Sequence, residues 1–515
     1  MIAQPENALP ESALPENAGA ALAQLAAGRP ALVWRRLVAD TETPVGAALK
    51  LFEDGRGDFL LESVQGGEVR GRYSLLGLAP DLMFRARGER AEINRRWATD
   101  PHAFEPVDDD ALTAMRRLVT ACRMTVPEGL PSALACLVGF FAYETIGLVE
   151  KLPRPPANPL DLPDMLFARP TLVLVFDRLA DQLFLVAPLW PDGPGTPDEK
   201  VAGAIELIET QAAMLAGPLP PRSRSDLDPA ELQRVPQLQP GRYREMVLKA
   251  KDYIAAGDIF QVVLAQRFTI DFALPPIDLY RALRRINPSP FLYFLDLPGF
   301  ALIGSSPEIL VRARDGEVTI RPIAGTRPRG RTAAEDAAHR ESLLADPKER
   351  AEHLMLLDLG RNDVGRVARA GTVEVTDSYT VEHYSHVMHI VSNVVGRLDP
   401  AKDALDALFA GFPAGTVSGA PKVRACEIIA ELEPETRGPY AGGVGYFSPD
   451  GSMDSCIVLR TAVVKDGVMH VQAGAGIVAD SDPTYEQNEC EAKSGALLAA
   501  AREALKCAAE PDFGQ

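Results

Sequence analysis

The pattern of hydrophobic and polar positions predicts short β-strands interleaved with helices along most of the chain. Alternating or continuous short runs of apolar residues are typical of strands, and apolar positions three and four residues apart are typical of helices. We expect helices at residues 111–119, 200–215, 243–256 and 348–359. We expect strands at residues 31–37, 58–64, 171–176, 183–188, 260–270, 318–323, 384–395, 443–447, 457–464 and 468–473.

The order of these elements predicts an α+β fold with large antiparallel sheets, because helices and strands occur in clusters rather than in strict alternation. Residues 217–241 concentrate proline, serine and charge, as linkers do. We therefore expect a disordered acidic tail at 1–26, an N-terminal domain at 27–215, a linker at 216–241 and a second domain at 242–508.

Composition narrows the classes of partner. The 515 residues are 46% hydrophobic and 24% charged, as in a soluble globular protein, and the formal net charge is -18. Such an acidic chain disfavours nucleic acid as a partner. The apolar run at 133–143 is too short to span a membrane, and the first residues lack the pattern of a secretory signal. Six cysteines without a Cys-x-x-Cys pair predict reduced thiols and a cytoplasmic protein.

Two pairs of glutamates are candidate metal ligands. Glu349 and Glu352 are three residues apart on one predicted helix, and Glu486 and Glu489 repeat this spacing near the C-terminus. Residues at this spacing share a helical face. Two such faces opposite one another would offer the oxygen ligands that Mg²⁺ prefers. Judged on spacing alone, two solvated helix faces are the more frequent explanation.

Three histidines and four arginines form two further clusters. On a strand, His386 would point away from His383 and His389, so we do not expect a shared metal site, although one of the three is a candidate catalytic or substrate-contacting imidazole. The arginines form a basic island that indicates either a small anionic ligand or a solvated turn: Arg321, Arg327, Arg329 and Arg331.

Two glycine-rich segments superficially suggest nucleotide binding. The Gly-x-Gly-x-x-Ala pattern at 474–479 is followed by Asp480 and Pro483, which interrupt the helix that a dinucleotide site requires. The segment 415–422 has the wrong glycine spacing for a phosphate-binding loop. Nucleotide binding is therefore not expected.

An ordered set of segments fills most of the chain after the linker. It contains GDIFQVVLAQRF, SSPEIL, RPIAGTRPRG, AEHLMLLDLGRNDVGRV, VMHIVSNVVG, PAGTVSGAPK, YAGGVGYF, CIVLRTA and QAGAGIVADSDP. This set resembles the chorismate-utilising enzymes and, within them, the large subunits (component I) of anthranilate synthases. The resemblance implies large antiparallel sheets packed face to face with helices outside, and an N-terminal α/β regulatory portion.

Two positions discriminate among members of the family. Gln261 stands where isochorismate and salicylate synthases carry a lysine that activates water. Ala324 stands where aminodeoxychorismate synthases carry a nucleophilic lysine. The resemblance therefore implies Mg²⁺-dependent amination of chorismate at carbon 2 with ammonia, followed by pyruvate elimination to anthranilate, the first step of tryptophan biosynthesis. The alternatives are an aminodeoxychorismate synthase component I and a catalytically inactive tryptophan-binding sensor.

The resemblance also implies roles for individual residues. Glu352 and Glu489 would hold Mg²⁺, with Glu349 and Glu486 in support. Glu308 would be the general acid and His389 would handle a proton, with Thr416 and Gln261 completing the catalytic group. The residues implied in substrate binding are Gly325, Thr326, Tyr440, Arg460, Gly474, Ala475, Gly476 and Lys493.

Regulation and partners follow from the same resemblance. The segments LLES and RYS in the N-terminal half are similar to a tryptophan-sensing region, so feedback inhibition by tryptophan is expected. Many members read Pro-Tyr-Met where this chain has Pro-Phe-Leu. No glutaminase segment is visible, which implies a separate glutamine amidotransferase subunit (component II) in a heterotetramer. The residues implied in tryptophan binding are Leu61, Glu62, Ser63, Pro290, Phe291 and Leu292.

Overall fold

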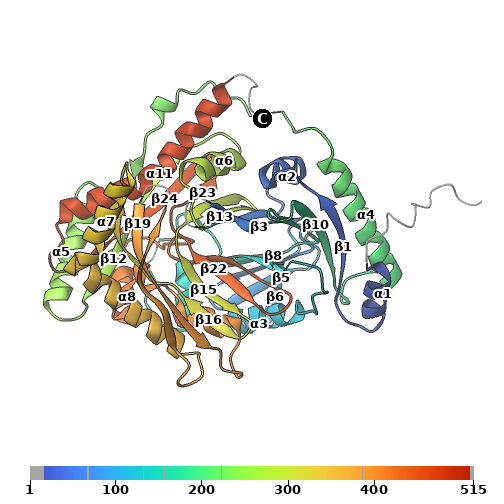
Figure 1. The fold of residues 1–515 in the computed structure, drawn as a ribbon, viewed down its shortest axis with the longest axis horizontal. Coiled ribbons are helices and arrows are strands. Elements are labelled where there is room, and N and C mark those ends of the chain that lie inside the picture. Colours follow the sequence, from blue (N-terminus) through green and yellow to red (C-terminus); the bar gives the residue numbers. More distant parts are fainter. Residues whose placement is uncertain are drawn as a thin grey trace, which may run out of the picture.

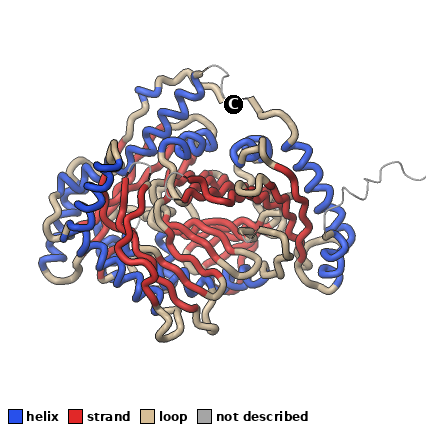
Figure 2. Tube along the Cα trace, in the orientation of Figure 1, coloured by secondary structure: helices blue, strands red, loops and turns tan. Residues whose placement is uncertain are grey.

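Two large sheets lie face to face with helices on the outside of the molecule (Figures 1 and 2). The computed structural model describes residues 17–65, 69–131, 133–154, 157–221, 223–384 and 387–510. Within these residues each sheet has 12 strands, and neighbouring strands pair antiparallel. The predicted α+β class, with antiparallel sheets packed face to face, is therefore confirmed.

The first sheet has the strand order β1-β10-β9-β3-β2-β13-β14-β23-β24-β12-β11, with β20 paired to β12. Its strands are β1 (Ala31–Val38), β2 (Asp58–Gln65), β3 (Val69–Leu78), β9 (Leu172–Asp177), β10 (Gln182–Leu189), β11 (Val235–Pro236), β12 (Gln261–Asp271), β13 (Phe291–Leu297), β14 (Phe300–Ser306), β20 (Gly419–Ala420), β23 (Thr461–Lys465) and β24 (Val468–Ile477).

The second sheet has the order β17-β19-β16-β15-β22-β21-β7-β8-β4-β5-β6, with β18 paired to β19. Its strands are β4 (Leu82–Arg87), β5 (Arg90–Asn94), β6 (Glu105–Asp110), β7 (Leu137–Phe141), β8 (Met165–Arg169), β15 (Ile309–Arg314), β16 (Glu317–Ile320), β17 (Ile323–Pro328), β18 (Glu374–His383), β19 (Val387–Arg397), β21 (Gly443–Phe447) and β22 (Met453–Ile457).

The helices cover the outer faces and ends of the sheets (Figure 1). Helices α1, α4 and α6 contact the first sheet, α11 contacts both α6 and β24, and α8 contacts β17 and β19 of the second. The helices are α1 (Ala18–Ala26), α2 (Pro44–Leu51), α3 (Ala111–Ala121), α4 (Pro197–Leu215), α5 (Arg242–Ala255), α6 (Pro276–Ile286), α7 (Ala333–Ala345), α8 (Pro347–Gly365), α9 (Ala404–Gly411), α10 (Lys422–Leu432) and α11 (Pro483–Ala509), with 3₁₀ turns η2 (Tyr143–Leu148), η3 (Pro229–Glu231) and η4 (Gly415–Val417).

Alternating side chains on the strands build two apolar cores. On β1, Trp34 belongs to a core that contains residues of both sheets, whereas Val33 belongs to a core formed with the outer helices. Phe140 of the second sheet packs edge-on against Phe300 of the first, with ring centroids 6.0 Å apart. This period of two is the strand pattern seen in the sequence. The burial of both faces explains why many strands read as continuous apolar runs.

Both sheets contain strands from the two halves of the chain. In the first sheet β2 pairs with β13, and in the second β7 pairs with β21. Residues 27–215 and 242–508 therefore share their cores. Their division into a regulatory and a catalytic part stays a prediction about function. Within the described residues of 216–241, only η3 and β11 are regular elements.

Most predicted elements are confirmed, and three expectations need correction. Residues 18–26 form α1 rather than a disordered tail, and residues 1–16 lie outside the described residues. The strand expected at 318–323 is divided between β16 and β17. The strand expected at 457–464 is also divided, because the chain leaves the second sheet after β22 and enters the first at β23.

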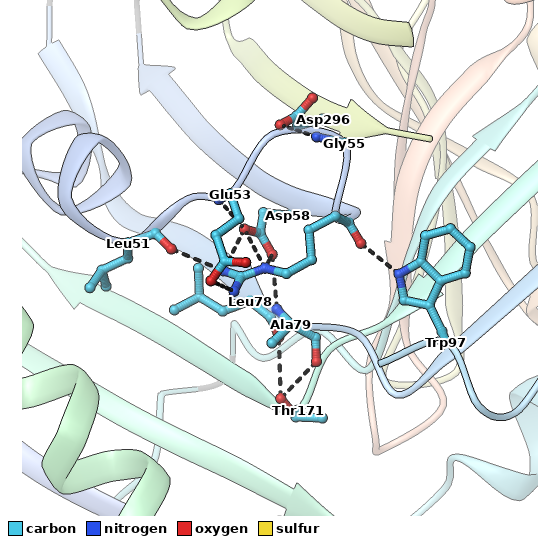
Figure 3. Close-up of polar contacts among 10 residues, drawn as sticks. Leu51, Glu53, Gly55, Asp58, Leu78, Ala79, Trp97, Thr171 and Asp296 are labelled. Carbon is cyan, nitrogen blue, oxygen red and sulfur yellow. Dashed lines mark hydrogen bonds and ion pairs between the residues drawn. The ribbon is translucent and has the colours of Figure 1, made fainter. Parts of the chain in front are cut away.

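A tight loop at residues 52–57 fixes the start of β2 (Figure 3). The buried carboxylate of Asp58 accepts hydrogen bonds from Arg56 Nη2 at 2.7 Å and from the Ala79 backbone N–H at 2.8 Å. The Gly55 N–H donates to Asp296 of β13 at 3.0 Å, and Trp97 Nε1 donates to the Arg56 carbonyl at 2.7 Å. The loop therefore joins β2 to β3, to β13 and to the second sheet.

We expect Asp58→Ala to lower the free energy of unfolding by about 3 kcal/mol, because it leaves the Arg56 guanidinium without its principal partner inside the protein. The matched control is Asp161→Ala, which removes an exposed ion pair with Arg87 and should change stability by less than about 1 kcal/mol. Denaturant unfolding of both variants measures the difference. Equal stabilities would show that the Asp58 cluster does not anchor the loop.

Candidate active site

The predicted acid and the predicted substrate-binding arginine lie where the chain crosses between the sheets. Glu308 lies between β14 and β15, and Arg460 lies between β22 and β23. The Ile457 N–H donates to the Glu308 carbonyl at 3.0 Å, and the Ser305 N–H donates to the Arg460 carbonyl at 3.2 Å. The two crossings therefore run side by side and bring Glu308 and Arg460 to one region.

Glu308 is the most strongly perturbed carboxyl group of this region. The residue is only 8% exposed, and burial raises the pKa of its carboxyl to about 8, with a small opposing effect from Thr416. No ion pair to Glu308 exists among the described residues. The buried Thr416 Oγ1 forms no well-formed hydrogen bond in the same part of the chain. Glu308 is therefore a neutral acid near pH 7, with a proton to donate.

His389 on β19 is held in one orientation. Its Nδ1 lies 2.8 Å from the Gly325 carbonyl and 3.2 Å from Thr326 Oγ1. Burial lowers the pKa of the imidazole to about 4, so the ring is neutral near pH 7. We assign the Nδ1 proton to the bond with the Gly325 carbonyl, because a carbonyl only accepts. Nε2 is then an unprotonated acceptor.

Arg460 has a guanidinium with no ion pair or side-chain hydrogen bond within the described ranges. Loss of water lowers its pKa, and Tyr384 partly opposes that effect. A desolvated cation without a partner is unfavourable unless an anion pairs with it. The position therefore suits a carboxylate of a ligand.

Backbone and side chains of β12, β24 and α11 form the neighbouring wall. Lys493 Nζ donates to the Gly474 carbonyl at 2.9 Å. A Cβ at Gly474 would lie 2.8 Å from Tyr440 Oη, and one at Gly476 would lie 2.6 Å from Gln261 Nε2. Glycine therefore lets both polar side chains approach the strand. The buried Gln261 Oε1 has no partner among the described residues.

The four predicted metal-site glutamates lie on α8 and α11. Burial raises the pKa of Glu352, and the charges of Glu349 and Glu489 raise it further. Burial is also the main cause of the raised pKa of Glu486, with a contribution from Glu489. Each pair is placed by a capped helix start: Asp346 accepts from the first backbone N–H groups of α8 and Asp482 from those of α11. The two helices therefore concentrate negative charge at one place.

These carboxylates do not form a closed metal shell. Among the described residues, no group of three or more His, Cys, Asp or Glu has the arrangement of metal ligands. Glu349 is paired with Arg327 at 2.9 Å and Glu489 with Lys493 at 2.7 Å. Mg²⁺ is commonly held by only one or two carboxylates together with water and substrate oxygens. The mutual repulsion of Glu352 and Glu489 fits such an open site.

Other motifs of the sequence lie outside this arrangement. His383 is at the end of β18 and forms no cluster with His389, and His386 lies outside the described residues. The first glycine-rich segment is followed by a turn and then by α11, and Lys422 of the second segment pairs with Asp363. The basic island is neutralised at three of its members by carboxylates: Arg321 by Glu382, Arg327 by Asp346 and Glu349, and Arg329 by Asp336.

Sequence reasoning missed two residues near the site. The rings of Tyr384 and His389 pack with their centroids 5.3 Å apart. Burial lowers the pKa of Arg460 and the charge of Tyr384 raises it, while burial and, to a lesser degree, the charge of Glu308 raise the pKa of Tyr384. Tyr384 lies in the histidine-rich segment, and its aromatic side chain beside those histidines was the feature that could have marked it as a site residue. Arg437 contacts the segments that carry Thr416 and Gln261. A single arginine before a glycine and a proline carries no such signal.

The two segments predicted to bind tryptophan are neighbouring strands. Ser63 of β2 is opposite Phe291 of β13, and Glu62 is opposite Leu292. The strand bulges between Glu62 and Val64. The carboxylate of Glu62 is already occupied by neighbouring side chains of α6, of β3 and of the segment after β9: Tyr280 at 2.6 Å, Arg284 at 2.5 and 3.0 Å, Ser74 and Arg178.

Comparisons with known proteins identify the family of this chain. The model of the chorismate binding enzyme family matches residues 59–499. The anthranilate synthase component 1 of Cereibacter sphaeroides is 52% identical over 482 residues, which cover 93% of this chain and 96% of that protein. The chain belongs to the anthranilate synthase component 1 group of chorismate binding enzymes.

Solved structures of related enzymes show the same fold. The crystal structure of anthranilate synthase component I from Streptococcus pneumoniae superposes with a TM-score of 0.74 at 36% identity and covers 90% of this chain and 99% of that one. The menaquinone-specific isochorismate synthase of Escherichia coli superposes with a TM-score of 0.69 over 94% of this chain. At 21% identity it supports the fold alone.

We expect Glu308→Gln to stabilise the protein near pH 8. The folded-state pKa of about 8 lies above the ordinary 4.5, so ionisation opposes folding as the pH rises through this interval. One pKa unit corresponds to about 1.4 kcal/mol, which sets an upper value of about 4 kcal/mol for the gain. Below pH 4.5 the difference should vanish, because Glu308 is protonated in both states.

Denaturant unfolding of wild type and Glu308→Gln across this pH range measures the effect. A stability difference that does not change with pH would contradict the raised pKa.

Proposed function

We propose that the chain converts chorismate and ammonia to anthranilate and pyruvate. The observation that carries this proposal is the neutral buried acid Glu308 in one site with the neutral His389 and with Arg460, which has no ion pair among the described residues. A proton donor, a carboxylate-binding cation and a proton acceptor are the groups that the reaction needs. The names of the relatives support the same reaction.

Substrate recognition rests on the two carboxylates of chorismate. Arg460 pairs with one of them, because it has no carboxylate partner within the described residues. The backbone around Gly474, Ala475 and Gly476 and the Tyr440 hydroxyl line the wall at which Lys493 is held. Gly325 and Thr326 belong to the same site through their contacts with His389.

In the first step ammonia forms a bond to carbon 2 while the ring double bonds shift. The carbon 4–oxygen bond breaks, and Glu308 donates the proton that lets the hydroxyl leave as water. Thr416 lies beside Glu308, and its hydroxyl can hold the leaving oxygen. The raised pKa keeps Glu308 protonated for this task at neutral pH.

In the second step the ring becomes aromatic. His389 accepts the proton from carbon 2 through the unprotonated Nε2, and the carbon 3–oxygen bond breaks to release the side chain as the enolate of pyruvate. The methylene carbon of this enolate then takes up one proton, which gives pyruvate. The low pKa favours an imidazole that is neutral before this transfer. The hydrogen bond from Nδ1 to the Gly325 carbonyl keeps the ring in the required orientation.

Mg²⁺ bound between α8 and α11 would neutralise the ring carboxylate of chorismate and polarise it. Glu352 and Glu489 would hold the ion, and Glu349 and Glu486 would support it through water. Their mutual repulsion supports this assignment, because a cation relieves it.

The nature of the nucleophile follows from Gln261 and Ala324. Neither carries the lysine amine that would activate water or attack the ring itself, so added ammonia is the nucleophile that this site accommodates. This favours anthranilate over the product of an aminodeoxychorismate synthase. The presence of the complete acid and base set favours catalysis over a tryptophan sensor without activity.

The term component 1 in the names of the relatives refers to one part of a larger assembly. We propose that a glutamine amidotransferase subunit supplies ammonia to this chain in a heterotetramer in the cytoplasm. In the part of the chain that the structure describes, no helix has the length and apolar content required to cross a bilayer.

Tryptophan is proposed to inhibit the enzyme from the β2–β13 pair. Ser63 and Phe291 face each other across these strands, and Pro290 precedes them. Glu62 is held by Arg284 and Tyr280, so it supports the site through its backbone neighbours Leu61 and Ser63. Leu292 lies opposite Glu62 in the same register.

The direct test of the activity is incubation of the chain with chorismate, Mg²⁺ and ammonium, followed by anthranilate fluorescence. We expect product from wild type and a kcat lowered by about 10²- to 10⁴-fold in Glu308→Gln, the range for loss of a general acid. Glu317→Gln, on the next hairpin, is the matched control and should retain the wild-type rate. Chorismate left intact by the wild type would refute the proposed reaction.

Inhibition by tryptophan should be lost in Ser63→Phe, because the larger side chain fills the space beside Phe291. The control Val38→Phe changes an exposed position of the same sheet and should remain inhibited. Rates with increasing tryptophan measure both variants. Wild-type inhibition of Ser63→Phe would place the effector elsewhere.

A further inference from the structure

Arg437 is a buried guanidinium outside the set of residues that touch the substrate in our proposal. Its side chain is 1% exposed and is paired with Glu433, which is 3% exposed. A buried arginine is tolerated only when its donors are satisfied. Arg437 Nε donates to Glu433 Oε2 at 2.9 Å, and Nη2 donates to Glu433 Oε1 at 2.6 Å.

The remaining donors of Arg437 join two backbone segments of the active site. Nη1 donates to the Val417 carbonyl at 2.7 Å, and Nη2 donates to the Val263 carbonyl, also at 2.7 Å. Val417 follows Thr416 in η4, and Val263 shares a face of β12 with Gln261. One guanidinium therefore sets the distance between these two segments.

Further contacts hold the guanidinium in place. The Tyr143 ring lies 4.6 Å and the Tyr440 ring 5.7 Å from its central carbon. Glu144 accepts a hydrogen bond from the Arg437 backbone N–H at 2.7 Å, and Glu433 accepts one from the Ala265 N–H of β12 at 2.8 Å. Tyr440 is thus a site residue whose ring lies beside the Arg437 guanidinium itself.

We propose that Arg437 is a positioning residue for the amination reaction, holding Thr416, Gln261 and Tyr440 in one geometry. The inference rests on the proposed function and adds a residue that does not touch the substrate. Arginine is required because the nitrogens of its planar guanidinium reach Glu433 and two carbonyls at once, whereas a lysine carries all its donors on one nitrogen.

A cavity beside the Arg437–Glu433 pair offers a way to test the positioning role of Arg437. Arg437 and Glu433 line a space of about 190 Å³ whose other walls include Tyr143, Glu144 and Cys426. Arg437→Ala would join the vacated guanidinium position to this cavity. Free guanidinium at millimolar concentration can then enter and bind Glu433 and the two carbonyls.

The experiment measures anthranilate formation by wild type, Arg437→Ala and Arg437→Lys, with thermal unfolding as a check on folding. We expect kcat of Arg437→Ala to fall by about 10²-fold, the cost of a misplacement near 1 Å, with a smaller change in KM for chorismate. Guanidinium should restore part of this loss, and Arg437→Lys should remain impaired.

The matched control is Arg267→Ala, which removes a second buried arginine, on β12, that pairs with Glu435 and donates to no site carbonyl among the described residues. It should keep a near wild-type kcat and show no response to guanidinium. A wild-type kcat and KM in folded Arg437→Ala would overturn the proposal. If that variant does not fold, a wild-type kcat and KM in Arg437→Lys would overturn it.

Loss of activity in Arg437→Ala that guanidinium does not restore, together with an equal loss in Arg267→Ala, would also overturn the positioning role. An inactive wild type would instead refute the proposed function, so the two failures are distinguishable.

Discussion

Burial of Glu308, which has no cationic partner among the described residues, is the constraint on which the chemistry of this site depends. The carboxyl lies where the chain passes from one sheet to the other, and loss of water raises its pKa to about 8. The same desolvation keeps His389 neutral and leaves Arg460 in need of an anion. One physical cause, the removal of water where the chain crosses between the two sheets, therefore gives the three groups the protonation states that our proposal requires of an acid, a base and a carboxylate-binding cation.

The chain can cross between the sheets at this place because each sheet contains strands from both halves of the chain. The predicted tryptophan segments lie on β2 and β13, which pair with each other, and β13 also pairs with β14. Strand β14 leads directly to Glu308. The proposed tryptophan site and Glu308 are therefore joined by neighbouring paired strands. Arg437 adds a second connection, between the segments of Thr416 and Gln261.

Much of this arrangement could be predicted from the sequence, and the failures have physical causes. Helix spacing placed Glu349 with Glu352 and Glu486 with Glu489, because a helical period is local. The apolar run at 457–464 was wrongly predicted as one strand: the chain turns at Arg460, whose φ of +49° breaks the strand, and composition does not report that turn. Residues that act through distant contacts, such as Arg437 with Val263, gave no local pattern to detect.

The protonation state of Glu308 can be measured directly by infrared difference spectroscopy between wild type and Glu308→Gln. The account predicts a carbonyl band of a protonated carboxylic acid at neutral pH in the wild type. The band should be absent from the variant and should disappear as the pH rises through about 8. A carboxylate band alone at pH 7 would contradict it, because Glu308 would then have no proton to donate to the leaving hydroxyl.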